Sequence, residues 1–220
     1  MIRLEKVKKS YRLDRDRWIH ALEDITVEIE KGEFLSIVGP SGSGKSTFLA
    51  IAGLIDRPSE GKVWFDGRDV TTLSDAQRAG IRSQKCGFVF QFPSLIPTLT
   101  SLENVMLPKT IAGRYEAADE GQASALLEKV GLADKAEHLP FQLSGGEQRR
   151  VAMARALMND PEVVLADEPT GALDQENAMI ILDVFKQLNK EGKTILMVTH
   201  DRELALQGQR MIRIEKGKVV

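Results

Sequence analysis

Polar and apolar residues alternate in the first third of the chain in the manner of an antiparallel sheet. Single polar residues separate Ile25, Val27 and Ile29, which is typical of a strand with one buried face. The Asp66-Gly67 pair stands between two short runs of strand-forming residues and predicts the tight turn of a β-hairpin. We therefore expect antiparallel β structure near the N-terminus.

A second pattern, of short apolar runs without alternation, predicts a parallel sheet. The runs are FLSIV at residues 34–38, VVLA at 163–166 and TILMVT at 194–199, and each is typical of a strand buried on both faces. Helical patterns lie between them. The clearest one follows Gln175 and consists of Ala178, Ile181, Leu182, Phe185 and Leu188. This order of elements predicts an α/β fold in which helices cover the sheet.

The stretch from about residue 98 to residue 158 differs, because it carries helical patterns and no run typical of a buried strand. We interpret it as a helical subdomain inserted into the α/β core. The predicted organisation is a single domain spanning residues 1–220, with the core and its antiparallel part at 1–91 and 159–220 and the helical subdomain at 92–158.

The most informative motif is GPSGSGKST at residues 39–47, which follows a predicted buried strand and precedes a helix-forming segment. Its glycines allow successive backbone N–H groups to point inward toward an anion. Lys45, which we expect to be exposed at the loop, adds positive charge for the β- and γ-phosphates, and the Ser46 hydroxyl is suited to Mg²⁺. The motif predicts a nucleotide-binding loop made of Gly39, Ser41, Gly42, Ser43, Gly44, Lys45, Ser46 and Thr47.

Two adjacent acids, Asp167 and Glu168, follow the predicted buried strand VVLA. Alone, such a pair is weak evidence, because strand ends commonly carry solvated charge. Together with a phosphate loop it indicates hydrolysis at the γ-phosphate. We assign Asp167 to the Mg²⁺ shell and Glu168 to the attacking water, which it orients and deprotonates.

Two further polar residues follow predicted strands. Gln91 stands after GFVF, at the entrance to the helical insert, where its side chain could reach the metal or the attacking water. His200 follows TILMVT, where a ring N–H could contact phosphate. Taken singly, each is better interpreted as a polar loop residue, but their order along the chain favours a role at the γ-phosphate.

The stretch LSGGEQRR at residues 143–150 predicts a second anion site. Ser144 and Glu147 have the spacing of a capping box at a helix start. Gly145 and Gly146 leave the first turn without side chains, so a large anion could approach the free N–H groups and the positive end of the helix dipole. One chain therefore carries two predicted phosphate sites, about a hundred residues apart.

Composition and charge narrow the function classes. Thirty basic against 32 acidic residues in 220 give a net charge of -2, so no overall basic field attracts nucleic acid. The single cysteine, Cys86, is expected to be a buried apolar residue of a strand. The N-terminus lacks the apolar core of a signal peptide, and apolar runs such as residues 48–55 are far shorter than the roughly 20 residues that span a bilayer. Any membrane-spanning helices are expected from another chain.

Over essentially its full length the chain resembles the ATPase subunits of ABC transporters. The motifs that carry the resemblance are the Walker A loop at residues 39–47, the Q-loop Gln91, the signature LSGGEQ at 143–148, the Walker B strand VVLADE at 163–168, the D-loop GALD at 171–174 and the switch histidine His200. Arg149 departs from the family pattern, in which glutamine is frequent. The phrases GFVFQFPSLIPTLTSLENV and LADEPTGALD most resemble the subfamily of lipoprotein-releasing and macrolide-export ATPases.

The resemblance implies a P-loop NTPase fold, with ATP and Mg²⁺ as ligands. It implies Lys45, Gln91, Glu168 and His200 as catalytic residues, Ser46, Gln91 and Asp167 at the metal, and Tyr11 stacked on adenine, with Trp18 as the less favoured candidate. It also implies a separate membrane-spanning permease and a peripheral location on the cytoplasmic side of the plasma membrane. Because the signature surface faces outward in the family, the second phosphate site is expected to serve a second copy of the chain, through Ser144, Gly145, Gly146 and Gln148.

Two alternatives remain open at this point. One is a soluble ABC ATPase that acts on nucleic acid or ribosomes, although the long coiled coil or the second cassette of such relatives is absent from this sequence. The other is a nucleotide-gated scaffold that does not hydrolyse ATP, which would have no need of a base at Glu168. We expect no nucleic-acid partner.

Overall fold

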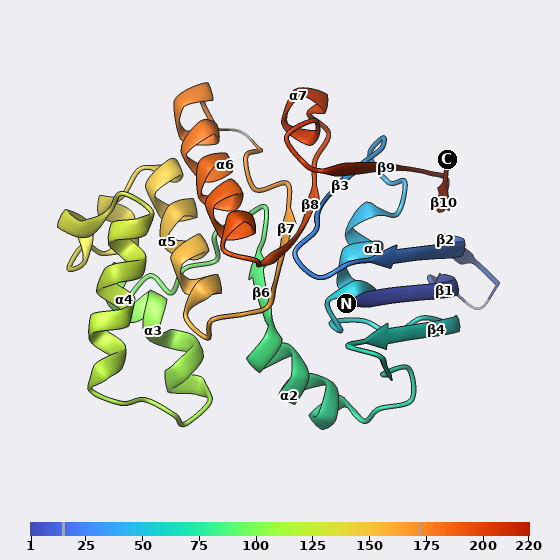
Figure 1. Ribbon diagram of the computed structural model, residues 1–220, viewed down its shortest axis with the longest axis horizontal. Coiled ribbons are helices and arrows are strands. Elements are labelled where there is room, and N and C mark those ends of the chain that lie inside the picture. The colour runs from blue at the N-terminus through green and yellow to red at the C-terminus, as the bar shows by residue number, and fades with distance from the viewer. Residues whose placement is uncertain (15, 172) are drawn as a thin grey trace. The chain divides into compact units, whose positions relative to one another are not determined.

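A computed structural model describes residues 1–14, 16–171 and 173–220. The chain forms two compact units (Figure 1), one made of residues 1–82 and 194–220 and the other of residues 83–193. Among the described residues, no helix has the length and apolar character needed to cross a bilayer.

The first unit contains a four-stranded antiparallel sheet in the order β2-β1-β4-β5. Its strands are β1 (Ile2–Arg12), β2 (Trp18–Ile29), β4 (Glu60–Phe65) and β5 (Arg68–Asp69), and the first three lie side by side in Figure 1. In β2, Ile25, Val27 and Ile29 are buried and the residues between them exposed, which confirms the predicted alternation. Asp66 and Gly67 both have positive φ, of 48° and 74°, as a type I′ hairpin turn requires.

The same unit holds a second group of strands in the order β10-β9-β3-β8. They are β3 (Phe34–Val38), β8 (Thr194–Val198), β9 (Arg210–Glu215) and β10 (Lys218–Val219). Strand β3 runs parallel to β8 and β9, and every residue of β3 and β8 is buried, as the unbroken apolar runs predict. The helices are α1 (Lys45–Ala52), α2 (Asp75–Lys85, whose last three residues belong to the second unit) and α7 (Arg202–Ala205).

The second unit pairs β6 (Cys86–Val89) in parallel with β7 (Val163–Asp167). Cys86 is buried in β6, as expected. Helix α6 (Gln175–Lys190) begins at the N-cap Asp174 and buries Ala178, Ile181, Leu182, Phe185 and Leu188. The predicted helical face is therefore confirmed.

Three helices of this unit, α3 (Ser101–Ile111), α4 (Ala118–Lys129) and α5 (Gly145–Leu157), pack together (Figure 1). Two short 3-10 turns, η1 (Ala133–Lys135) and η2 (Pro140–Gln142), connect α4 to α5. Residues 98–158, all of which the structure describes, contain no strand, as predicted. The proposed subdomain limits at residues 92 and 158 remain a prediction, because the compact units divide the chain at other positions.

Candidate functional site

The predicted phosphate loop connects the end of β3 to the start of α1 in the first unit. Gly44 caps α1 with φ 106°, and a β-carbon added there would lie 2.3 Å from the carbonyl oxygen of Ala21. Only glycine fits that conformation and that space. Beside Gly42, which has φ 72°, an added β-carbon would meet no atom within 4 Å. The loop is thus held tightly at one glycine and open at the other, where an anion can approach the backbone.

Lys45 is inside this loop, not exposed as expected. Its side chain folds back so that Nζ donates hydrogen bonds to the carbonyl oxygens of Gly39 and Pro40, both at 2.9 Å, and the residue is only 8% exposed. The expectation of an exposed lysine was wrong because the curled loop offers carbonyl oxygens that an ammonium group binds. The charge consequently lies at the centre of the loop, and its third N–H donor remains available.

Ser43 also indicates a ligand in the loop. The residue is 4% exposed, and its Oγ is buried with no hydrogen-bond partner in the described part of the chain. Buried hydroxyl groups are nearly always paired, with an ion or ordered water where protein atoms are missing. A phosphate oxygen is the acceptor that this loop suits.

A hollow of about 280 Å³ adjoins the loop within the first unit. It is lined by residues 42–47 together with Tyr11, Ile19, His20 and Ala21. Tyr11 therefore shares a cavity with the loop, whereas Trp18 is not among the lining residues and lies beside the Arg12 guanidinium, 5.9 Å from its ring centroid. This placement favours Tyr11 over Trp18 as the stacking residue. Sequence reasoning missed His20, because its place opposite Ser10 depends on the β1–β2 register, which no sequence pattern marks.

His200 lies at the same sheet edge as the start of the phosphate loop. Ile37 of β3 pairs with Val198 of β8, and the Thr199 N–H continues the ladder by donating to the Ile37 carbonyl at 3.1 Å. Gly39, where the loop begins, is two residues after Ile37, and His200 is likewise two residues after Val198. Parallel pairing therefore brings the histidine backbone to the carboxyl edge where ligands of α/β sheets bind.

In the second unit, the β6–β7 register places Gln91, Asp167 and Glu168 at the same edge of the strand pair. Val89 of β6 pairs with Ala166 of β7, so the residues that follow both strands leave the sheet on the same side. The Asp167 Oδ1 atom is buried without a hydrogen-bond partner among the described atoms. Glu168 has φ 49°, a conformation that costs energy for a residue with a side chain and is concentrated at functional sites.

The capping box at the start of α5 is confirmed. The Glu147 N–H donates to Ser144 Oγ at 3.2 Å, and the Ser144 N–H donates to Glu147 Oε2 at 2.7 Å. The bond from the Ser144 backbone holds the pKa of Glu147 below its usual value. Gln148 uses its amide NH₂ group to hold the preceding turn, by bonds to the carbonyl oxygens of Pro140 and Leu143, so its predicted contact with nucleotide stays a prediction.

The two glycines of the signature differ in the space around them. Beyond its chain neighbours and its own helix backbone, a β-carbon at Gly145 would meet no described atom within 4 Å, whereas one at Gly146 would lie 2.7 Å from the side chain of Asn177. The helix start is therefore open at Gly145 and closed at Gly146. In the D-loop match, Ala172 lies outside the described residues, while Asp174 caps α6 by accepting the Asn177 N–H at 2.8 Å.

Two arginines of α5 bind the segment that carries Gln91, which the sequence did not predict. Arg149 directs Nε and Nη2 to the Gln91 carbonyl oxygen, both at 3.4 Å. Arg155 donates to the carbonyl oxygens of Pro93 at 2.6 Å and Ser94 at 2.9 Å. The signature helix and the Q-loop segment are thus connected directly, and Arg149, the departure from the family pattern, is one of the connections.

In each unit, taken by itself, these groups suit a part of a magnesium nucleotide. Mg²⁺ prefers hard oxygen ligands, keeps several waters and is held through carboxylates and phosphate oxygens, and the unpaired buried oxygen of Asp167 is a ligand of that type. The Ser46 hydroxyl, at the second position of α1, is another. The Lys45 ammonium and the start of α1 suit the phosphates.

Comparison with known proteins agrees with this chemistry. The ABC transporter family model matches residues 22–171. The lipoprotein-releasing system ATP-binding protein LolD of Aquifex aeolicus is 46% identical over all of this chain and 96% of its own length. The macrolide export ATP-binding/permease protein MacB of Nitrobacter winogradskyi is 47% identical over all of this chain, which spans 34% of that larger protein.

Solved structures give the same result. One is the dimeric structure of the ATP-binding cassette MJ0796 in a post-hydrolysis state, bound to ADP and Pi. It matches this chain with a TM-score of 0.92 at 44% identity, and the match covers all of this chain and 96% of the MJ0796 chain. The match extends over the α/β core and the helical segment together, which confirms the predicted P-loop NTPase fold. The chain is therefore an ATP-binding, ATP-hydrolysing cassette and belongs to the ABC transporter family.

Proposed function

We propose that this cassette is the ATPase subunit of a transporter of the lipoprotein-release or macrolide-export type and that it drives a separate membrane-spanning subunit. The observation that carries the proposal is the full-length match to LolD at 46% identity. MacB, by its name, joins an ATP-binding part to a permease in one protein, and this chain corresponds to about a third of it. LolD, by its name, is the ATP-binding protein of a releasing system, and this chain covers 96% of its length, which supports a permease in trans as the partner.

Within this function we propose a role for each residue of the site. Lys45 and the backbone of residues 39–47 hold the phosphates, and Ser46, Asp167 and Gln91 hold Mg²⁺, which when bound neutralises charge on the β- and γ-phosphate oxygens. Glu168 accepts a proton from the attacking water, as a general base positioned at a strand end. His200 donates a hydrogen bond to the γ-phosphate.

Co-purification with a membrane protein, combined with ATP turnover, tests the proposal. The tagged chain is expressed with the membrane protein encoded beside its gene, extracted in detergent and assayed for phosphate release. We expect a stoichiometric complex with measurable turnover. A chain that turns over ATP but co-purifies with ribosomes or nucleic acid would instead support the alternative of a soluble ABC ATPase.

Replacing Tyr11 with alanine tests the adenine platform. If the ring stacks on the base, affinity for MgATP should fall by about 1–3 kcal/mol, or roughly 5- to 150-fold, which is the range for loss of an aromatic partner of a base. GTP affinity should fall similarly, because every base has a π face. Equilibrium titration with a fluorescent ATP analogue measures the loss.

The matched control is Trp18→Ala, which removes the other aromatic of the hairpin outside the hollow. It should leave affinity unchanged. A loss at Trp18 with none at Tyr11 would reverse the assignment.

A further inference from the structure

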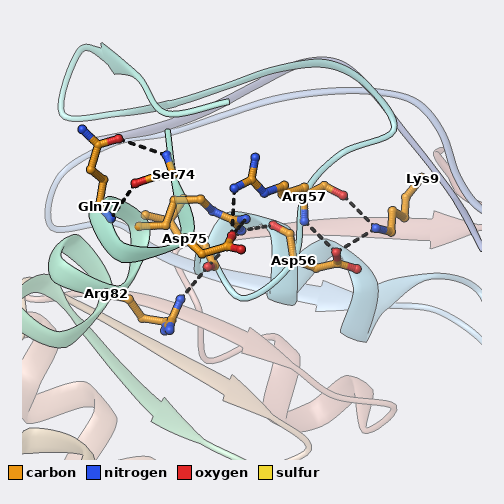
Figure 2. Close-up of polar contacts among 9 residues, drawn as sticks. Lys9, Asp56, Arg57, Ser74, Asp75, Gln77 and Arg82 are labelled. Carbon is orange, nitrogen blue, oxygen red and sulfur yellow. Dashed lines mark hydrogen bonds and ion pairs between the residues drawn. The ribbon is translucent and has the colours of Figure 1, made fainter. Parts of the chain in front are cut away.

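Asp56 lies in the connection after α1 and binds the proposed adenine platform directly. The Tyr11 hydroxyl donates to Asp56 Oδ2 at 2.8 Å. The other carboxylate oxygen, Oδ1, accepts from Lys9 Nζ at 2.7 Å and from the Arg57 N–H at 2.7 Å. Both oxygens of one carboxylate therefore hold neighbouring groups. Figure 2 shows the contacts of Lys9 and Arg57 with Asp56.

Lys9 contacts the same tyrosine from another side. Its Nζ lies 4.8 Å from the centroid of the Tyr11 ring, within the range of a cation–π contact, and also donates to the Arg57 carbonyl oxygen at 2.8 Å. The ammonium group thus bridges the ring of Tyr11 and the carboxylate that binds its hydroxyl. The ring is restrained at both its edge and its face.

Arginines of α2 anchor the connection in turn. Arg78, which is 5% exposed, donates to the carbonyl oxygens of Leu54 and Asp56. Arg82 adds a second bond to the Leu54 oxygen at 2.8 Å. Arg57 also binds Asp75 at 2.8 Å, and Figure 2 shows both of these residues together with Arg82. The backbone that carries Asp56 is consequently held in place by hydrogen bonds from α2.

The charges of the cluster support one arrangement of protons. Burial alone would raise the pKa of Asp56, but the bonds from Lys9, Tyr11 and the Arg57 N–H lower it below its usual value. Burial, together with the bond to Asp56, raises the pKa of Tyr11. The carboxylate therefore stays ionised as acceptor and the phenol stays protonated as donor at neutral pH.

We propose that Asp56 is a positioning residue for nucleotide binding, which together with Lys9 fixes the Tyr11 ring as the platform for adenine. The inference rests on the proposed function of Tyr11. Helix α1 then serves the nucleotide at both ends, because its N-terminus belongs to the phosphate loop and the segment after its C-terminus carries the aspartate that orients the base platform.

The test compares two ligands on the variant Asp56→Asn. Affinities for MgATP and for magnesium tripolyphosphate, which has the phosphates and no base, are measured by calorimetry on the full chain. The side-chain amide of this variant presents an NH₂ group to Lys9 or Tyr11, so the platform should loosen. We expect about three- to tenfold weaker binding of MgATP, smaller than the effect of Tyr11→Ala because it acts through that ring, and unchanged binding of tripolyphosphate.

Two further variants exclude a general structural effect. Tyr11→Phe keeps the ring and removes only the hydroxyl, which donates a hydrogen bond to Asp56. This variant should reproduce the selective loss of affinity for MgATP. Glu60→Gln, which breaks the exposed Lys8–Glu60 pair of 2.7 Å on the same sheet, is the matched control and should change neither affinity.

The double variant Tyr11→Ala with Asp56→Asn separates positioning from independent contact. If Asp56 acts through Tyr11, the double variant should bind MgATP no more weakly than Tyr11→Ala alone. Additive losses, equal losses for the two ligands or full affinity in Asp56→Asn and Tyr11→Phe would each overturn the inference. Failure of the wild-type chain to bind MgATP would instead overturn the proposed function.

Discussion

Replacing Lys45 with alanine is expected to lower ATP turnover by about 10²–10³-fold, the scale for removal of one preorganised donor at a developing charge. The effect should be large because the ammonium group lies inside the phosphate loop and is 8% exposed. Its position is fixed by the carbonyl oxygens of Gly39 and Pro40, so its removal takes a preorganised charge out of the loop. Phosphate release at saturating MgATP measures the loss.

Because Lys45 is buried and hydrogen-bonded, the variant is also expected to melt a few degrees below the wild type in the absence of nucleotide. Lys8→Ala is the control, since Lys8 is an exposed lysine of β1 whose ion pair with Glu60 lies outside the loop, and it should retain full turnover. A folded Lys45→Ala chain with normal turnover would remove the assignment of the phosphate loop.

Local patterns predicted the elements and the order of the motifs. The buried runs became β3, β7 and β8, and the Ser144–Glu147 spacing became a capping box with both bonds formed. These features depend on residues a few positions apart, where burial and hydrogen bonding follow directly from the sequence. Parallel pairing of β6 with β7 then placed Gln91 at the same edge as Asp167 and Glu168, and pairing of β3 with β8 placed His200 at the same edge as the start of the phosphate loop.

Contacts between distant residues were not predictable in the same way. The bonds from Lys9 and Tyr11 to Asp56 join residues 47 and 45 positions apart. Lys9 and Tyr11 lie on β1, whose register with β2 shifts between Leu4 and Val7, between Val7 and Lys9 and between Lys9 and Ser10. Lys6 and Asp24 have positive φ on the two strands of this pair, and no sequence pattern marks such bulges. The burial of Lys45 was missed for a related reason, because it depends on which carbonyl oxygens the curled loop presents.

The arginine contacts of α5 show the same limit. Arg149 and Arg155 reach back about 60 residues to the segment after β6, and in the sequence they look like the exposed charges of an amphipathic helix. Only the packing of the second unit reveals that they bind carbonyl oxygens next to Gln91. The signature helix therefore contacts the Q-loop segment through two side chains.

Replacing Glu168 with glutamine is expected to give a chain that binds ATP, hydrolyses it about 10²–10⁴-fold more slowly and accumulates as a dimer. The loss follows from the proposed role of Glu168 as the base, since an amide cannot accept the proton of the attacking water. Dimerisation follows from the second phosphate site, because the start of α5 is open at Gly145 and its free N–H groups suit the γ-phosphate of a partner's ATP. A head-to-tail pair with two-fold symmetry would bury two nucleotides, each between residues 39–47 of one chain and the signature of the other.

Adding Gly145→Asp to Glu168→Gln should abolish this dimer while ATP still binds the chain's own loop. Apart from the adjoining residues and the helix's own backbone, no described atom lies within 4 Å of a β-carbon added at the first position of α5, and a carboxylate suits the helix N-terminus, so folding should be unaffected. The carboxylate would repel the γ-phosphate of the partner's nucleotide. Gly121→Asp, at an equally open glycine of α4, adds the same charge elsewhere and should leave the dimer intact. Size-exclusion chromatography with light scattering, in ATP and Mg²⁺, measures dimer formation. Two results would show that the signature does not bind a partner's nucleotide. One is a Glu168→Gln chain that stays monomeric when saturated with ATP, and the other is a Gly145→Asp double variant that dimerises as well as its Gly121→Asp control.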